Sequence, residues 1–130
     1  MNNEKQALIT YRLDCSDEML SDARSLIEES RWKSAVNRLY YAVFQAVSAL
    51  MIQEGIRIKS HSGAKVMFEL HFIKAGRVNK IWSKFYNDLS DNREESDYGV
   101  FIKYSQDDVL PLLSQTEEFI DVIKALITTT

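Results

Sequence analysis

The sequence predicts an all-α fold, namely an up-and-down antiparallel four-helix bundle with an additional short helix. The 130-residue chain has four Gly and one Pro, which is too few turn residues for a sheet of many short strands. Apolar residues recur at helical spacing along most of the chain. The composition, 45% apolar and 27% charged, is typical of a folded protein, and the length predicts a single domain over residues 1–130.

Five amphipathic segments define the predicted helices. They cover about residues 4–29, 32–54, 61–74, 78–93, and a last one from 107 or 108 onward. Cap-type residues at 15–17 allow a break in the first helix. Residues 94–104 are predicted to form a loop. Pro111 favours a late start for the last helix, because proline is tolerated in a first turn.

The second predicted helix has the widest apolar face, and Gly55 is expected to end it. Ser60 or Ser62 is expected to cap the third helix. The residues expected to face the core are Ile9, Leu13, Leu20, Ala23 and Ile27, then Ala35, Leu39, Ala42, Val43, Ala46, Val47 and Leu50, then Val66, Met67, Leu70 and Ile73, then Val78, Ile81, Trp82, Phe85 and Leu89, and finally Val109, Leu112, Leu113, Thr116, Ile120, Ile123 and Ile127.

Charge is unevenly distributed along the chain, although the net charge is only −3. Residues 31–80 contain nine basic and two acidic side chains, whereas residues 1–30 contain three and seven, and residues 81–130 contain four and ten. A basic middle between acidic ends predicts either one phosphate-binding face or charges that neutralise one another across packed helices.

Several classes of function are disfavoured. The lone Cys15 cannot form an internal disulfide, and no paired-histidine, CxxC, phosphate-loop or hydrolase-elbow motif is present. We therefore expect no cofactor and no metal. No window of 18 residues is wholly apolar and the first residues do not resemble a secretion signal, so neither a membrane span nor a membrane partner is expected, and the cytoplasm is the expected location.

Arg93 is the first candidate for a binding site. It lies four residues after Leu89, on the predicted core-facing side of the fourth helix, and Asp97 and Tyr98 follow it. An inward arginine near a carboxylate can be a structural ion pair, a fork that binds phosphate, or both.

Two further groups are candidates. Arg38 and Tyr41 lie, with Gln45 and Ser48, on a polar strip beside the apolar face of the second helix, which can be a hydrogen-bonded seam or one side of a ligand groove. His61 lies at the start of the third helix, where free backbone N–H groups can hold an anion. The alternative is a capping or packing histidine.

Three spaced motifs together resemble those of the HEPN family, whose name stands for higher eukaryote and prokaryote nucleotide-binding. They are the AVNRLYYAVF segment at 35–44, the SHSG segment at 60–63 followed by Phe68, and Arg93 followed by Asp97 and Tyr98. The resemblance covers about residues 8–127. It is greatest to the stand-alone prokaryotic branch with RLYYAxF and R…DY signatures.

This resemblance implies a bundle of four main helices and one short helix. It also implies frequent homodimers, with the functional groove at the dimer interface, and a minimal nucleotidyltransferase partner in systems that often act as toxin and antitoxin. Many members are metal-independent endoribonucleases whose motif is an arginine followed, after four to six residues, by a histidine. Here those positions hold Tyr98, Gly99 and Val100, and tyrosine is a poor base at neutral pH.

Three hypotheses follow. The leading one is a nucleotide- or RNA-binding protein in which Arg93 holds a phosphate, Asp97 orients Arg93, Tyr98 stacks or donates a hydrogen bond, and Arg38, Tyr41 and His61 line the same groove. The second is a metal-independent endoribonuclease with Arg93, Tyr98 and His61 as candidate catalytic residues. The third is a helical protein-interaction module without a ligand.

Overall fold

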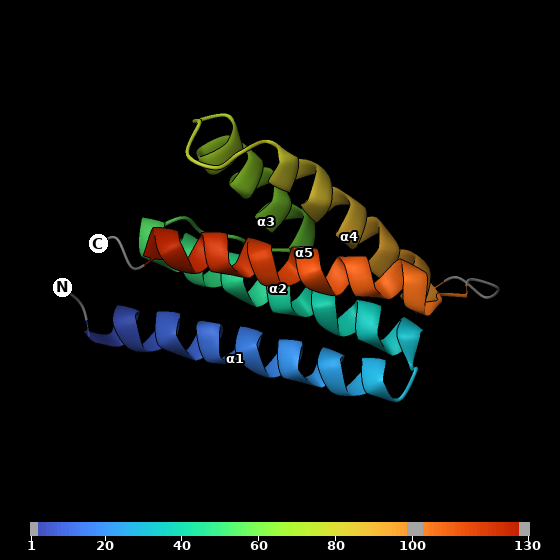
Figure 1. The fold of residues 1–130 in the computed structure, drawn as a ribbon. Helices are drawn as coiled ribbons and strands as arrows, with labels where there is room; N and C mark the ends of the chain where they lie inside the picture. Colours follow the sequence, from blue (N-terminus) through green and yellow to red (C-terminus); the bar gives the residue numbers. More distant parts are fainter. Residues whose placement is uncertain (1–2, 99–102, 128–130) are drawn as a thin grey trace.

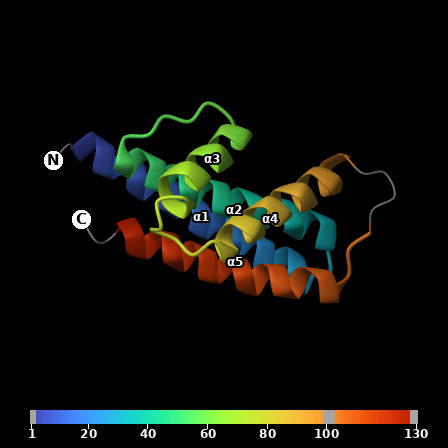
Figure 2. The ribbon, with the colours of Figure 1, turned by 90° about the horizontal axis from the view of Figure 1, so that it is seen from above.

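The computed structural model describes residues 3–98 and 103–127, with the side chains of 95–98 excepted. The elements are α1 (Asn3–Glu28), α2 (Trp32–Glu54), α3 (His61–Phe68), the π-helical turn η1 (Glu69–Ile73), α4 (Ile81–Tyr98) and α5 (Gln106–Ile127). Helices α1, α2, α4 and α5 run alternately up and down, and the short α3 is inserted between the second and third of them (Figures 1 and 2). The predicted fold class is confirmed.

Helix α2 is the centre of the bundle and packs against α1, α3, α4 and α5. Every residue predicted on its apolar face is buried, and it ends at Gly55, whose left-handed backbone (φ 71°) favours glycine. By length and hydropathy α2 could cross a membrane, although no membrane span was expected from the sequence. However, 67% of its most apolar window is buried inside the bundle, as in a core helix.

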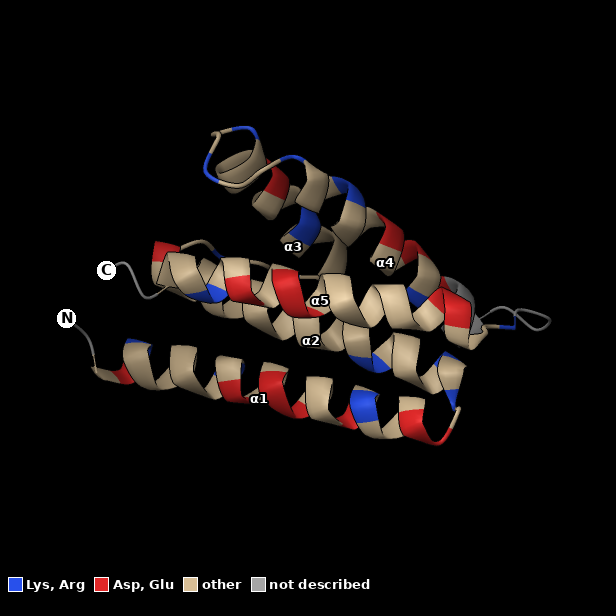
Figure 3. Ribbon diagram, in the orientation of Figure 1, with Lys and Arg blue, Asp and Glu red and all other residues tan. Residues whose placement is uncertain are grey.

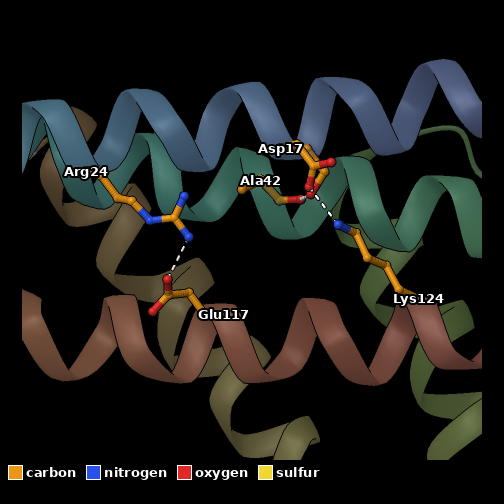
Figure 4. Close-up of polar contacts among 6 residues, drawn as sticks. Asp17, Arg24, Ala42, Glu117 and Lys124 are labelled. Carbon is orange, nitrogen blue, oxygen red and sulfur yellow. Dashed lines mark hydrogen bonds and ion pairs between the residues drawn. The ribbon is translucent and has the colours of Figure 1, made fainter.

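Helix α1 is continuous, so the break allowed at 15–17 does not occur. Ser16 is fully buried, and its hydroxyl donates a 2.7 Å hydrogen bond to the Ala42 carbonyl of α2. Toward solvent, α1 is joined to α5 by the ion pairs Arg24–Glu117 (2.6 Å) and Asp17–Lys124 (2.7 Å), as Figure 4 shows.

These two kinds of contact should contribute differently to stability. Ser16→Ala is expected to lower the free energy of unfolding by about 1 kcal/mol, because it removes a buried hydrogen bond. Arg24→Ala should cost less than about 0.5 kcal/mol, because water already solvates that pair. Urea unfolding followed by circular dichroism measures both, and an equal or larger loss for Arg24→Ala would contradict the expectation.

The third predicted helix packs with a different face from the one expected. Val66 and Leu70, which were predicted to point inward, are 59% and 50% exposed, and Phe68 and Phe72 are buried instead. The regular helix ends at Phe68 and continues as η1, in which the Lys74 N–H donates to the Glu69 carbonyl five residues earlier. Two apolar faces compete in this segment, and the larger aromatic side chains occupy the core.

Both ends of α4 differ from the prediction. It begins at Ile81 rather than 78, and it continues to Tyr98, so residues 94–98 are helical and not part of a loop. Asn79 accepts a hydrogen bond from the Ile81 N–H at the start of the helix, which sets the later beginning. Ile81, predicted to face inward, is 60% exposed.

Helix α5 begins at Gln106, slightly before the predicted start. The Ser105 N–H and hydroxyl both donate to the Asp108 carboxylate, which caps the first turn. Pro111 therefore lies inside the helix rather than in its first turn. Because proline has no N–H, the carbonyl four residues earlier receives no hydrogen bond from it. Phe119, absent from the predicted core, is fully buried.

Candidate functional site

Arg93 is held against the central helix by an aromatic ring. Tyr86, Ser90 and Arg93 follow one another at helical spacing on the buried face of α4. The Arg93 guanidinium carbon lies 4.8 Å from the centre of the Tyr40 ring of α2, and only 9% of the residue is exposed. A cation over a ring face is attracted to the ring electrons, so this contact fixes the guanidinium in position.

His61 lies in an aromatic cage built by α2. Its ring centre is 4.4 Å from that of Phe44, 5.5 Å from that of Tyr41 and 5.8 Å from that of Tyr40. Ser60 caps α3 by accepting a 2.9 Å hydrogen bond from the Gly63 N–H, which confirms one of the two predicted caps. His61 is therefore the first residue of a capped helix that lies over the middle of α2.

Arg93 and His61 are close enough to influence each other electrostatically. Burial lowers the pKa of His61 below its ordinary value, and the Arg93 charge lowers that pKa further. Burial also raises the pKa of Tyr40, against the opposing charge of Arg93. At neutral pH the site therefore combines a fixed cation, a neutral imidazole and a protonated phenol. The sequence left open whether His61 approaches Arg93, and the fold brings the two together.

The other predicted residues are placed as follows. Tyr41 joins the site through His61, whereas the Arg38 guanidinium lies 3.8 Å from the Met19 sulfur of α1. Asp97 and Tyr98 lie on the last turn of α4, one helical turn beyond Arg93, and their side chains are outside the described residues. Gly99 and Val100 are also outside the described residues.

Tyr40 and Phe44 were not among the predicted site residues, yet they form the floor of the site. Their rings lie in nearly parallel planes, with centres 6.5 Å apart. The available signal was their separation of four residues next to Tyr41, which places two aromatic rings on one face of α2. A buried aromatic pair has the same spacing in a plain core, so the spacing alone could not identify a site.

A basic groove opens on the other side of His61, between α1, α2 and the connection from α2 to α3. It has a volume of about 490 Å³; half of its twelve lining residues are apolar, and the others include the cations Arg12, Arg57 and Lys59 together with Ser48 and His61. The Arg12 guanidinium donates a 3.1 Å hydrogen bond to the Gln45 side chain of the predicted polar strip. The groove thus adds three cations to the site formed by Arg93 and His61.

Charges elsewhere follow the unevenness of the sequence. Acidic residues recur along α1 and α5 (Figure 3). The turn between η1 and α4 is basic and contains Lys74, Arg77 and Lys80. Arg77 pairs with Glu54, which belongs to the same middle segment of the sequence. Within residues 3–94 and 103–127, no three His, Cys, Asp or Glu side chains are grouped to hold a metal ion. The chemistry visible at the site is that of a cation, an imidazole and aromatic rings.

Comparison with known proteins gives consistent results. The HEPN domain model matches residues 10–126. A "UPF0332 protein" of Thermotoga maritima is 40% identical over 125 residues, which covers 96% of this chain and 95% of that protein. Two proteins of Methanocaldococcus jannaschii, named "Putative toxin MJ0605" and "Putative toxin MJ0142", are 31% and 27% identical and cover 95% and 86% of this chain, and 92% and 76% of their own lengths.

The family match spans the helices that carry the site, from Thr10 in α1 to Leu126 in α5, and includes Tyr40, His61 and Arg93. The resemblance seen in the sequence motifs is thereby confirmed. The chain belongs to the HEPN domain family.

Proposed function

We propose that this HEPN protein binds single-stranded RNA, or a nucleotide, with one phosphate at Arg93 and His61. The observation that carries the proposal is the Arg93 guanidinium, fixed over Tyr40 and electrostatically coupled to the neutral imidazole of His61, which itself lines the basic groove. A guanidinium held in place binds a phosphate without first losing conformational freedom. Membership of the HEPN family, whose name refers to nucleotide binding, supports a nucleotide or RNA as the ligand class.

The basic groove offers cations beside this site that would bind a second phosphate of the same strand. Arg57 and Lys59 lie on the connection before α3, next to His61, and Arg12 reaches the groove from α1. Cations lined up beside aromatic rings are the usual means by which proteins track a single strand. Binding should therefore weaken as salt rises, because counterions are released from the strand.

A second function is favoured by the position of His61, namely metal-independent cleavage of RNA. The neutral His61 imidazole would accept the proton of a ribose 2′-OH, and that oxygen would attack the adjacent phosphorus. The bond to the 5′-oxygen would break, and that oxygen would take a proton from water, leaving a cyclic phosphate. Arg93 would stabilise the negative charge that develops on the phosphate oxygens.

The pH dependence separates the two functions. RNA affinity is expected to rise as pH falls through the lowered pKa of His61, below about 6.5, because the imidazolium adds a cation beside the phosphate. Cleavage should instead rise as pH increases through that pKa, because only the neutral imidazole accepts a proton. Fluorescence anisotropy and a gel assay in excess EDTA measure the two quantities.

His61→Asn is the matched variant for this test, because it keeps a polar side chain that does not titrate. It should remove the pH dependence of binding between pH 5 and 7 while leaving affinity at pH 8 nearly unchanged. A wild-type protein whose affinity is the same at pH 5 and pH 8 would contradict a His61 contact with phosphate.

The partner and the assembly stay proposals. A minimal nucleotidyltransferase partner and a homodimer rest on the family resemblance. So does the inclusion of Asp97 and Tyr98 in the ligand site. The cytoplasmic location rests on the sequence alone.

A further inference from the structure

A second hollow, separate from the basic groove, lies between α3–η1 and α4. It has a volume of about 350 Å³, within the range of small-ligand pockets. Its apolar walls include Val66, Leu70 and Phe68, and polar groups reach it from Lys65, Glu69 and Asn87. Val66 and Leu70 are two of the four residues of this segment that the sequence predicted to be in the core, and here they face an open hollow at 59% and 50% exposure.

This hollow continues the Arg93 site along the same pair of helices. Helix α3 runs opposite to α4 (Figure 2), so His61 lies near Arg93 at one end, and Glu69 accepts a hydrogen bond from Ser83 at the other. Lys65 is one turn from His61, and Asn87 is six residues before Arg93, about 9 Å along the helix axis. A phosphate at Arg93 and a group in the hollow would therefore belong to one short stretch of a strand.

The lining has the chemistry of a nucleobase site. A base has two apolar faces and a polar edge that carries both donors and acceptors, and the hollow offers aliphatic walls together with a carboxamide, a carboxylate and an ammonium group. The carboxamide of asparagine can pair with adenine through two hydrogen bonds. A fatty acid would leave the Asn87 carboxamide without a partner, and a sugar would gain little from the aliphatic walls.

One further observation marks the hollow as a site. It is bordered by the π turn η1, and single π-helical turns are frequent at functional sites.

We propose that this hollow is a base-binding subsite, which receives a nucleobase, adenine among them, from the RNA strand whose phosphate lies at Arg93. The inference rests on the proposed function and adds base recognition to it. RNA that carries bases should therefore bind more tightly than a ribose–phosphate strand of the same length and charge that carries none.

The test compares labelled oligoadenylate with the abasic strand by fluorescence anisotropy. Wild type should bind oligoadenylate about tenfold more tightly than the abasic strand. Asn87→Ala, and Val66→Trp to fill the hollow, should each lower oligoadenylate affinity several-fold and leave abasic binding unchanged. Gln115→Ala removes an equivalent exposed carboxamide from α5 and should change neither affinity.

The outcomes are separable. Equal wild-type affinity for the two strands would overturn the base subsite while the phosphate site stands. A loss of abasic binding in Asn87→Ala would also overturn it, because the hollow would then serve the backbone. Absence of binding to both strands by wild type would overturn the subsite and the proposed function together. Circular dichroism melts of each variant show whether the protein is folded.

Discussion

Arg93→Ala is expected to weaken RNA binding about 10- to 100-fold at moderate salt. Hydrogen bonds to charged groups contribute roughly 1.5–3 kcal/mol, and a factor of ten in affinity corresponds to about 1.4 kcal/mol. The loss should be large because the Arg93 guanidinium is positioned by Tyr40 before the ligand arrives. Cleavage in EDTA, if wild type shows it, should disappear in the same variant.

A conservative variant distinguishes a role in binding from a role in folding. Arg93→Lys keeps the positive charge but loses the planar fork, so it should bind RNA better than Arg93→Ala and worse than wild type. Arg93→Ala also removes a cation from the Tyr40 ring, which should lower the melting temperature by a few degrees. The melting temperature of Arg93→Lys should stay near that of wild type.

Salt dependence provides the control. If Arg93 contacts one phosphate, its loss should reduce the slope of log affinity against log salt by about one contact. Exposed Arg24, which is paired with Glu117 on the opposite side of the bundle, offers a matched arginine whose replacement should leave RNA affinity unchanged. RNA binding by Arg93→Ala that equals wild type would place the phosphate elsewhere and return Arg93 to a structural role.

The sequence was most informative where the spacing of apolar residues is compatible with only one buried helix face. Helix α2 carries one wide apolar stripe, so its bounds, its buried face and its stop at Gly55 all followed from spacing. Arg93 was placed on the inner side of α4 by the same argument, from its distance to Leu89. In α2 burial extends beyond the predicted stripe, to Val36, Tyr40, Ala49 and Met51, because the helix is packed on several sides.

The approach of His61 to Arg93 could not be read from the sequence. It depends on the connection of residues 56–60, which leads back from the end of α2 so that α3 begins over the middle of that helix (Figure 2). Helical periodicity predicts where helices form, but it does not predict the path of the connection between them. The partners of His61 on α2 were equally hidden, because Tyr40 and Phe44 have the spacing of ordinary core residues.

The extent of α4 was missed for a related reason. Residues 94–98 are mostly polar and acidic, which is typical of a loop, yet the helix continues through them to Tyr98. A helical turn of polar residues has no apolar stripe from which its presence can be predicted. The consequence for the site is that Asp97 and Tyr98 continue the helix that carries Arg93, four and five residues beyond it.

Phe68→Ala is expected to cost about 3–5 kcal/mol of stability, the largest structural effect among these predictions. Phe68 is 1% exposed, and its ring contacts those of Phe72, Tyr86 and Phe119, so it ties α3 and η1 to α4 and α5. Removing it leaves a cavity that three rigid rings cannot fill. The melting temperature should fall by roughly 10 °C or more.

Leu70→Ala is the matched control, because it decides between the two faces that the sequence offered for this segment. Leu70 is half exposed, so its truncation should cost at most about 0.5 kcal/mol. The reverse order, with Leu70→Ala more damaging than Phe68→Ala, would mean that the originally predicted face is buried and that the segment is rotated about its axis. The hollow beside α4 would then be filled by Val66 and Leu70, and the base subsite would be lost with it.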